Sequence, residues 1–270
     1  MWPACEPFAT AGGRVARARR KQENFQAMRK RKLSAWGCLG GALWLLSCPA
    51  SLPAQAASGS WPPLANGERL VYGLLWPSGL SLGEAVLQAS LAGKEVRLSV
   101  TVDAALPQRR VGYVFSAVAT EDLCSLRFRQ RSQEGSRSWE ETVEFDQEKH
   151  EVRRTRNGQR SVASVPVCAR DPLTLLYHFR QQLAFQQLSL GTVKPGAFHL
   201  GADFSVRYEA VTPETVQVGA KVWEGDRFLV TYSGPNGENS FEVWIRPDPS
   251  RVPVAMKMQF PLATFAAELQ

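Results

Sequence analysis

The sequence contains few residues of the kinds that build catalytic and metal centres. It has three histidines, His150, His178 and His199, and none stands in an H-E-x-x-H pair or another spacing typical of zinc ligands. It also has no G-x-x-x-x-G-K loop of the kind that holds nucleotide phosphates. We therefore predict no catalytic, cofactor-binding or metal-binding residues and no cofactor.

A catalytic group could still assemble from distant positions in a fold. The carboxylates Asp122, Glu144 and Asp171 are candidates for an acid–base pair. Asp171 can instead cap a helix, Glu144 can pair with nearby arginines, and His178 is expected on a helix surface or between helix and sheet. Whether the protein is an enzyme stays open, and we favour a non-enzymatic role.

No apolar run reaches the roughly 20 residues that a membrane-spanning helix needs. The stretch from Leu33 to Cys48 is shorter, is broken by glycines, follows four consecutive basic residues and precedes a small-residue tail that ends at Ala56. This build is typical of a signal peptide rather than of a buried core helix. We predict a signal peptide at residues 28–56, cleaved between Ala56 and Ala57, and export to the periplasm or outer cell envelope.

A second cleavage position lies before Cys48, because Leu45-Leu46-Ser47-Cys48 resembles a lipoprotein box. Leu46 and Pro49 are unusual in such a box. Lipidation of Cys48, and with it peripheral membrane association, therefore remains an alternative to a soluble exported protein.

Residues 1–27 precede the signal, and we expect them to be an upstream extension outside the native protein, with Met28 as the initiator. A basic arm that binds nucleic acid is the alternative, and it conflicts with export. The first 56 residues contain nine Lys or Arg and two Asp or Glu, which leaves 23 of each sign in the rest of the chain. The mature protein is therefore formally neutral, and nucleic acid is not an expected partner.

Of the five cysteines, Cys124 and Cys168 lie after the predicted signal peptide. Exported proteins fold in an oxidising compartment, so we predict a disulfide between these two residues. Two separate buried thiols are the alternative. A redox-active pair is not expected, because the spacing is not C-x-x-C.

Apolar residues recur mostly at every second position from Glu68 onward, as in antiparallel strands. Strands are expected at 70–76, 83–91, 96–102, 113–119, 126–131, 139–145, 152–155, 159–165, 204–211, 215–223, 227–232, 241–246, 252–260 and 264–269. We predict a mainly β fold with a strongly curved antiparallel sheet, a half-barrel or barrel, in a single domain at 68–270. Residues 57–67 are expected to form a flexible lead-in.

One segment breaks the strand period. Asp171 can cap a helix, Pro172 suits its first position, and Leu173, Leu176 and Tyr177 recur with helical spacing. We predict one α-helix, at about 171–185, packed on the sheet.

Two features of the predicted sheet allow a functional as well as a structural interpretation. Arg127, Arg129 and Arg131 could bind an anion, but Glu140 and Glu144 on the next strand favour a solvated ladder of ion pairs. Asn157-Gly158 predicts a type I′ turn in the following hairpin. The aromatic residues that alternate along the strands could line a ligand cavity, and we favour a place in the core.

Short motifs recur in order along the mature chain. They are Gly67-Glu68-Arg69-Leu70-Val71-Tyr72, Gly83-Glu84-Ala85, Asp171-Pro172-Leu173 with Leu176-Tyr177, Val243-Trp244-Ile245, Arg251-Val252-Pro253-Val254 and Glu268-Leu269. In this order they resemble the bacterial exported proteins of the domain of unknown function 3108 family. The resemblance implies an exported, mainly β protein of the cell envelope, and it carries over no activity or catalytic residues.

We expect a binding or carrier module for an apolar or amphipathic ligand, such as a lipid or lipoprotein acyl chain, or for an envelope protein partner. The alternative is an envelope hydrolase that acts on cell-wall or polysaccharide material through two facing carboxylates.

Overall fold

The computed structural model describes residues 61–65, 67–106, 109–199, 201–211, 213–235, 237–260 and 263–270. All of them belong to the compact unit Ala56–Gln270. The predicted extension 1–27, the signal peptide 28–56, its cleavage site at Ala56 and Ala57, and the lipidation site Cys48 lie outside the described residues.

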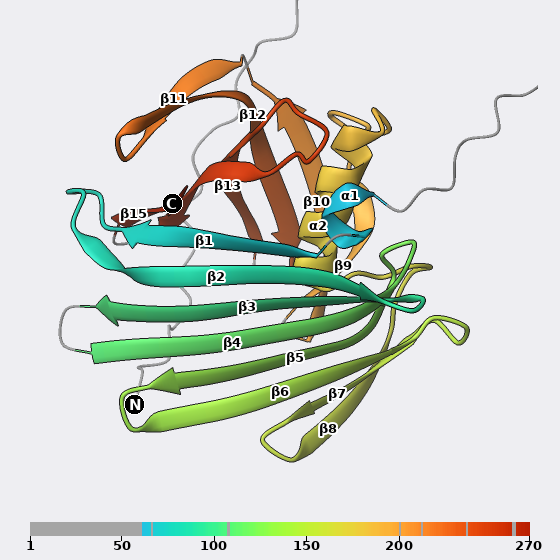
Figure 1. The fold of residues 1–270 in the computed structure, drawn as a ribbon. Helices are drawn as coiled ribbons and strands as arrows, with labels where there is room; N and C mark the ends of the chain where they lie inside the picture. Colours follow the sequence, from blue (N-terminus) through green and yellow to red (C-terminus); the bar gives the residue numbers. More distant parts are fainter. Residues whose placement is uncertain are drawn as a thin grey trace, which may run out of the picture. The chain divides into compact units, whose positions relative to one another are not determined.

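Fifteen strands in the described part of the chain form antiparallel pairs in one large, curved sheet (Figure 1). They are β1 (Glu68–Leu75), β2 (Ser81–Ala92), β3 (Glu95–Leu106), β4 (Arg109–Thr120), β5 (Ser125–Glu134), β6 (Arg137–Asp146), β7 (Glu151–Arg156), β8 (Gln159–Ser164), β9 (Lys194–His199), β10 (Ala202–Ala210), β11 (Glu214–Val218), β12 (Lys221–Gly234), β13 (Gly237–Ile245), β14 (Pro253–Phe260) and β15 (Ala263–Leu269). The predicted fold class, a mainly β protein with a strongly curved antiparallel sheet, is confirmed.

The strand order joins the two ends of the unit in the middle of the sheet. The order is β8-β7-β6-β5-β4-β3-β2-β1-β15-β14-β13-β12-β10-β9, with β11 paired to β12. Strand β1 pairs with β2 on one side and with β15 on the other. Strands β1–β8 and β9–β15 therefore form two walls, and β8 and β9 are the edges of the sheet (Figure 1).

Helix α2 (Pro172–Ala184) packs between the two walls. Leu173 and Tyr177 belong to the core cluster of the first wall, whereas Phe179 belongs to the core cluster of the second. The ring of Phe179 stacks on Tyr208 at 4.6 Å and meets Phe228 edge-on at 5.4 Å. The predicted helix is confirmed, and it connects two halves of the sheet that would otherwise expose apolar surface to water.

The helix begins where the sequence indicates. The Asp171 carboxylate accepts hydrogen bonds from the backbone N–H groups of Leu173 (2.9 Å) and Thr174 (3.1 Å), and Pro172 occupies the first turn. Asp171 also accepts from the hydroxyl of Ser125 at 2.6 Å. Burial raises the pKa of Asp171, while these hydrogen bonds act in the opposite direction.

A short helix, α1 (Pro62–Ala65), precedes the first strand. Trp61 and Leu64 are buried in the core of the first wall, and the Trp61 indole donates to the carbonyl of Pro249 at 3.0 Å. The sequence predicts only a flexible lead-in over 57–67. This docking was not foreseen, because proline-rich composition near a turn resembles a loop.

The predicted disulfide between Cys124 and Cys168 is confirmed, with Cα atoms 4.7 Å apart. It joins the turn after β4 to the segment that enters α2. The neighbouring Ser125 carbonyl and the Ala169 carbonyl both accept from the side chain of Gln147. Covalent and hydrogen-bonded links thus hold the start of the helix against the first wall.

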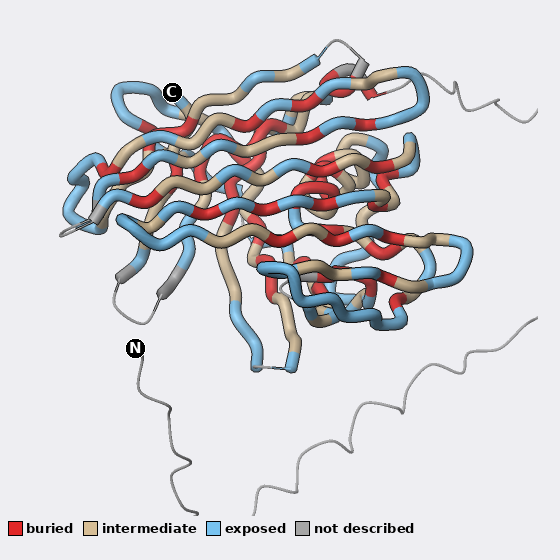
Figure 2. The backbone as a smooth tube through the Cα atoms, turned by 90° about the horizontal axis from the view of Figure 1, so that it is seen from below, coloured by how far each residue is buried: buried red, intermediate tan, exposed pale blue. Residues whose placement is uncertain are grey.

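Buried and exposed positions alternate along the strands of the first wall (Figure 2). Phe128, Val143 and Phe145 face the core, while Arg131 on the other face pairs with Glu140 at 3.0 Å. Arg129 pairs with the same carboxylate. The predicted ion-pair ladder is present on the outer face.

Candidate functional site

The inner face of the first wall changes from apolar to polar along three neighbouring strands. On β5, the core residue Phe128 is followed at the next inward position by Gln130, and on β6 Val143 is preceded by Glu141. Gln130 is 6% exposed and Glu141 is 1% exposed, and the two residues are direct cross-strand partners. On β7, Arg154 follows the buried Val152 at the next inward position. Polar and charged groups are therefore built into the interior of the curved sheet.

Glu141 is the anion of this polar region. Arg154 donates from Nη2 to Glu141 Oε2 at 2.8 Å, and Arg156 Nε lies 3.9 Å from the same oxygen. The Arg156 guanidinium also lies over the Trp139 ring, 4.8 Å from its centroid. The Arg154 side chain is 20% exposed and that of Arg156 is 44% exposed. One buried carboxylate thus faces two arginines that solvent can reach.

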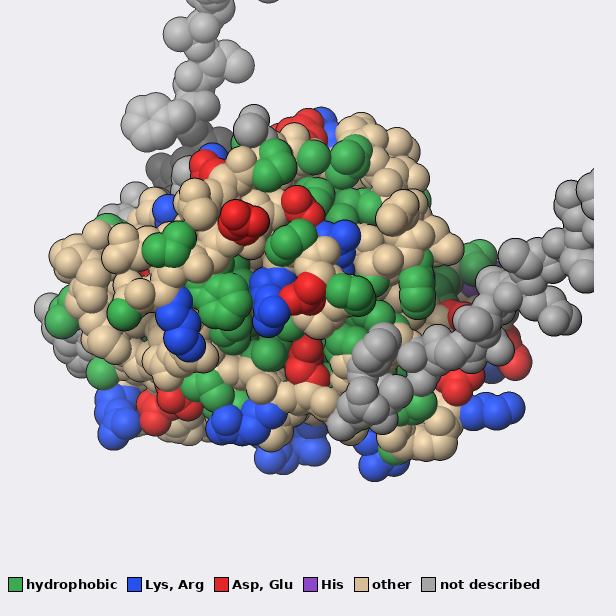
Figure 3. Space-filling view, turned by 45° about the horizontal axis from the view of Figure 1, so that its top comes forward, with side chains coloured by type: hydrophobic (Ala, Val, Ile, Leu, Met, Phe, Trp, Pro, Cys, Tyr) green, Lys and Arg blue, Asp and Glu red, His purple; other side chains and the backbone are tan. Residues whose placement is uncertain are grey.

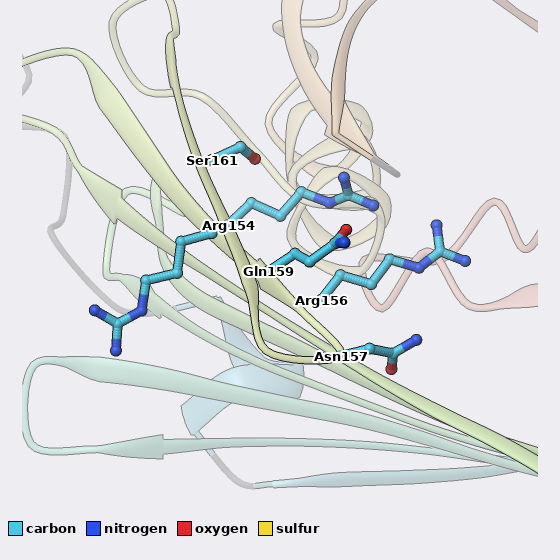
Figure 4. Close-up of a pocket in the computed structure, with 6 residues that line it drawn as sticks. Arg154, Arg156, Asn157, Gln159 and Ser161 are labelled. Carbon is cyan, nitrogen blue, oxygen red and sulfur yellow. The ribbon is translucent and has the colours of Figure 1, made fainter.

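A pocket of about 540 Å³ lies at the hairpin of β7 and β8. Its lining residues, which we call the arginine pocket, are Arg154, Arg156, Asn157, Gln159, Arg160 and Ser161. Arg154, Arg156 and Gln159 extend to one side of the hairpin (Figure 4), as the alternation of a strand requires. Among the described residues, the lining of the pocket includes three arginines and no carboxylate.

The predicted type I′ turn of this hairpin is present, since Asn157 and Gly158 both have positive φ, at 48° and 83°. The turn between β9 and β10 approaches the pocket from the other edge of the sheet. A Cβ atom built on Gly201 would lie 2.8 Å from Arg154 Nη1. The pocket therefore lies where the two edges of the sheet come close to each other.

Several buried polar atoms of this inner face have no hydrogen-bond partner among the described residues. They are Gln130 Oε1, Ser132 Oγ and Arg154 Nε. Leaving such a group unpaired costs about 1–3 kcal/mol, and buried polar atoms are normally paired with other protein groups or with ordered water. The polar region is thus suited to receiving a hydrogen-bonding molecule.

A row of aromatic rings adjoins the polar region. The rings of Tyr113 and Phe115 stack at 6.0 Å, and those of Phe115 and Phe128 at 6.3 Å. Tyr113 and Phe115 are half-buried, and Ser132 is the direct partner of both Tyr113 and Trp139 on its two sides. We call Tyr113, Phe115 and Trp139 the aromatic row. It provides apolar surface beside the arginine pocket.

A second, wider groove of about 890 Å³ runs over the ends of β3–β6, and its charged residues are already paired. Arg110 pairs with Asp103 at 3.3 Å. Hydrogen bonds from Arg129 and Arg131 lower the pKa of Glu140, which keeps this carboxylate ionised. A glycosidase needs one carboxyl group whose pKa is raised so that it can donate a proton, and Glu140 has the opposite property.

The other candidate acid–base residues are dispersed. Asp171 is buried as the helix cap, and Glu144 lies across from Arg127 and Arg153 in the outer ladder. Asp122 is exposed in the turn after β4. The structure does not bring these three carboxylates together in one pocket.

One pattern that the sequence analysis overlooked is Gly79-Leu80-Ser81-Leu82-Gly83, which matches the letters of the G-x-S-x-G hydrolase motif. That motif works on a sharp turn from a strand into a helix. Here Ser81 is the first residue of strand β2 and is the direct partner of Leu75. The surroundings of Ser81 are therefore those of a hairpin, not of a nucleophile elbow.

The structure places His178 where the sequence predicts it. His178 lies on α2 and is partly buried between helix and sheet, whereas His150 occupies the turn before β7 with a φ of 55°. Across the described residues, no group of three His, Cys, Asp or Glu side chains could hold a metal ion. Nor does any helix among those residues combine the length and hydropathy needed to cross a bilayer.

The stability of the protein is expected to fall as the pH drops from about 6.5 to about 4. Burial, with the positive charges of Arg170 and Lys194, lowers the pKa of His178 to about 4. The unfolded chain binds a proton near pH 6.5, so acid favours unfolding by about 1–2 kcal/mol after allowance for partial exposure. Urea unfolding at several pH values measures this, and His178→Gln should flatten the profile. An unchanged profile in that variant would contradict the assignment.

Residues of the family-like motifs meet in a buried network around Glu68. Arg180 binds both carboxylate oxygens of Glu68 at 2.7 Å, and the hydroxyl of Tyr177 donates to Glu68 Oε2 at 2.7 Å. The Arg180 side chain is fully buried and lies over the rings of Trp61 and Tyr177. Burial raises the pKa of Tyr72 and Tyr177, which keeps both phenols neutral donors.

The same network holds the segment before β14. Arg180 donates to the carbonyls of Arg251 (2.9 Å) and Ser250 (3.0 Å), and Tyr72 donates to the carbonyl of Pro253 at 2.9 Å. We call Glu68, Tyr72, Tyr177 and Arg180 the Glu68 network. Its groups are satisfied and buried, so its role is to fix helix, sheet and loop together rather than to bind a ligand.

The remaining surface offers no large region of one charge in the view of Figure 3, where acidic, basic and apolar side chains are interspersed. On the second wall, Arg227 pairs with Glu242 at 2.7 Å and lies over the Trp244 ring. The Trp244 indole donates to Glu214 at 2.8 Å. These charges are paired with protein groups.

Two solved structures show a partial similarity to the chain. A β-barrel-like protein of domain of unknown function DUF1849 from Brucella abortus matches with a TM-score of 0.49 and 10% identity, over 75% of this chain and 94% of that chain. A protein from Bacteroides fragilis, assigned as exported and with a YmcC-like fold, matches with a TM-score of 0.30 and 12% identity, over 74% and 92%.

No curated protein sequence matches the chain. The family model for proteins of unknown function, DUF3108, matches residues 69–270. That match contains most of the motifs noted in the sequence and nearly all of the sheet. The chain belongs to the DUF3108 family.

Proposed function

We propose that the protein is an exported cell-envelope protein that binds an apolar or amphipathic ligand on the inner face of its curved sheet. The single observation that carries this proposal is the aromatic row of Tyr113, Phe115 and Trp139 beside buried, unpaired polar atoms of Gln130 and Ser132. Ligand sites combine such apolar walls with a few polar groups that fix orientation.

Export is supported by the signal-like sequence before Ala57 and by the disulfide. Structural disulfides form in oxidising compartments such as the periplasm. Cell fractionation followed by thiol labelling is expected to find the protein in the envelope fraction with Cys124 and Cys168 oxidised. Recovery of the full-length chain with free thiols in the cytosol would contradict this part of the proposal.

Ligand binding is tested by truncating the aromatic row. Phe115→Ala is expected to weaken binding of a neutral short-chain diacylglycerol by roughly tenfold, because it removes an apolar contact worth about 1–2 kcal/mol. Val114→Ser is the matched control, since Val114 is the next residue on β4 and is 46% exposed on the opposite face. Isothermal titration calorimetry measures both, with melting curves to confirm folding.

Equal affinity of both variants and the parent protein would contradict binding at the aromatic row. Co-purification of lipid from the envelope, detected by native mass spectrometry, provides an independent measurement. We expect bound lipid in the parent protein and less in Phe115→Ala.

A further inference from the structure

We infer that the ligand carries a phosphate monoester, and that Arg154 and Arg156 bind it in the arginine pocket. This inference rests on the proposed function, because it names the polar end of the amphipathic molecule whose apolar part contacts the aromatic row.

The pocket has an excess of positive charge. Arg154 and Arg156 extend into it, whereas Arg160 has the opposite parity on β8, and Glu141, which pairs with Arg154 at 2.8 Å and lies 3.9 Å from Arg156, offsets one of the two charges. One positive charge therefore remains on this side of the hairpin. A phosphate monoester carries about −1.5 to −2 near neutral pH, so this charge attracts it more strongly than it attracts a singly charged carboxylate.

The donors of the pocket suit tetrahedral oxyanions. A guanidinium group presents N–H donors in a planar fork that binds two phosphate oxygens at once. Arg156 can do so because its side chain is 44% exposed and its Nε lies 3.9 Å from Glu141, beyond hydrogen-bond distance. Asn157, Gln159 and Ser161 add neutral side chains that can donate to the remaining oxygens.

Glu141 orients Arg154 from the interior side of the pocket. Its side chain is 1% exposed, so it contacts Arg154 from the interior and leaves the solvent side of the pocket to the arginines. Arg154 Nε has no acceptor among the described residues. An arginine held by a buried carboxylate on one side is pre-organised for an anion on the other.

Trp139 links the phosphate to the apolar part of the ligand. Arg156 lies over its ring at 4.8 Å, and Trp139 is joined through Ser132 to Tyr113 on the neighbouring strands. A molecule with its phosphate at Arg156 can therefore place its acyl part on the aromatic row. The geometry favours a phosphorylated amphiphile over a free phosphate ion.

The test is isothermal titration calorimetry of the purified protein with three probes. They are dihexanoyl phosphatidic acid below its critical micelle concentration, dihexanoylglycerol and inorganic phosphate. We expect the phosphatidic acid to bind at least tenfold more tightly than either of the others, because only this probe combines charge-assisted hydrogen bonds to the arginines with apolar contacts to the aromatic row.

Variants then locate the phosphate. Arg156→Gln is expected to weaken phosphatidic acid binding about tenfold and to leave dihexanoylglycerol binding unchanged. Arg156→Lys should retain part of the affinity, since it keeps the charge and loses the fork. Arg131→Gln is the matched control: Arg131 also shares a glutamate with a second arginine, but it lies on the outer face.

The results distinguish the phosphate inference from the proposed function. Equal binding of phosphatidic acid and dihexanoylglycerol overturns the phosphate inference and leaves the proposed function standing. If inorganic phosphate binds as tightly as the lipid, the inference that the ligand is an amphiphile is overturned. Binding of none of the probes overturns both, and an equal loss in Arg131→Gln and Arg156→Gln overturns the assignment to the pocket.

Discussion

Replacing Arg180 with methionine is expected to lower the free energy of unfolding by about 3–5 kcal/mol, the largest effect of any single side chain considered. The substitution leaves Glu68, whose side chain is 9% exposed, without its bidentate partner. It also removes the donors to the carbonyls of Ser250 and Arg251. Urea unfolding followed by circular dichroism measures the loss.

The size of the effect follows from the asymmetry of buried ion pairs. Desolvation of both charges offsets much of their attraction, so an intact buried pair contributes little net stability, yet one orphaned member is strongly destabilising. The double variant Glu68→Leu/Arg180→Met should therefore be more stable than Arg180→Met alone. If it is less stable than the single variant, the pair itself stabilises the fold and this explanation is wrong.

A matched control is the exposed pair of Arg97 and Glu95, at 62% and 48% side-chain exposure. Arg97→Gln is expected to change the free energy of unfolding by less than about 1 kcal/mol, because solvent screens the pair. If Arg97→Gln and Arg180→Met lower the free energy of unfolding by similar amounts, burial does not determine how much stability is lost with an ion pair.

Elements fixed by local chemistry could be predicted from the sequence. Asn157-Gly158 fixes the turn of β7 and β8, and Asp171-Pro172 fixes the start of α2. The alternation of apolar and charged residues along β5 and β6 also predicted which side chains of these strands face the core. In each case the deciding contacts lie within a few residues along the chain.

In the second wall, local sequence patterns did not predict the strand boundaries correctly. A strand was expected over 215–223 and another over 227–232, but the chain turns at Gly219 (φ 59°) and β12 then runs unbroken from Lys221 to Gly234. Gly225 lies inside this strand, where a Cβ would come 3.4 Å from the Ile245 carbonyl. Close packing, not a turn, explains this glycine. Strand β9 was not predicted, because Pro195 and Gly196 disfavour strand structure.

The candidate site required contacts that periodicity cannot supply. Arg154 and Arg156 share the parity of the buried Val152 on β7, and this signal alone could have placed them on the inner face. Their partner Glu141 and the ring of Trp139 follow from the register of β6 with β7. The Glu68–Arg180 pair spans 112 residues, and the motifs that resemble the family gave no indication that these two side chains meet.

Removing the disulfide is expected to lower the free energy of unfolding by about 2–4 kcal/mol. Cys124 and Cys168 are 44 residues apart, and the cross-link restricts the unfolded chain accordingly. Thermal unfolding of the Cys124→Ala/Cys168→Ala variant measures the loss, which corresponds to a melting temperature lower by roughly 5–15 °C for a domain of this size.

The position of the disulfide makes a second consequence testable. Ser125 follows Cys124 directly, and its hydroxyl both accepts from the Asp171 backbone at 2.8 Å and donates to the Asp171 carboxylate at 2.6 Å. Loss of the cross-link should therefore loosen the start of α2 as well, seen as faster amide exchange at Leu173 and Thr174. Reductant should destabilise the parent protein to the level of the double variant and leave that variant unchanged. If the variant melts at the same temperature as the oxidised parent, the hydrogen bonds of Asp171 alone hold the helix to the first wall.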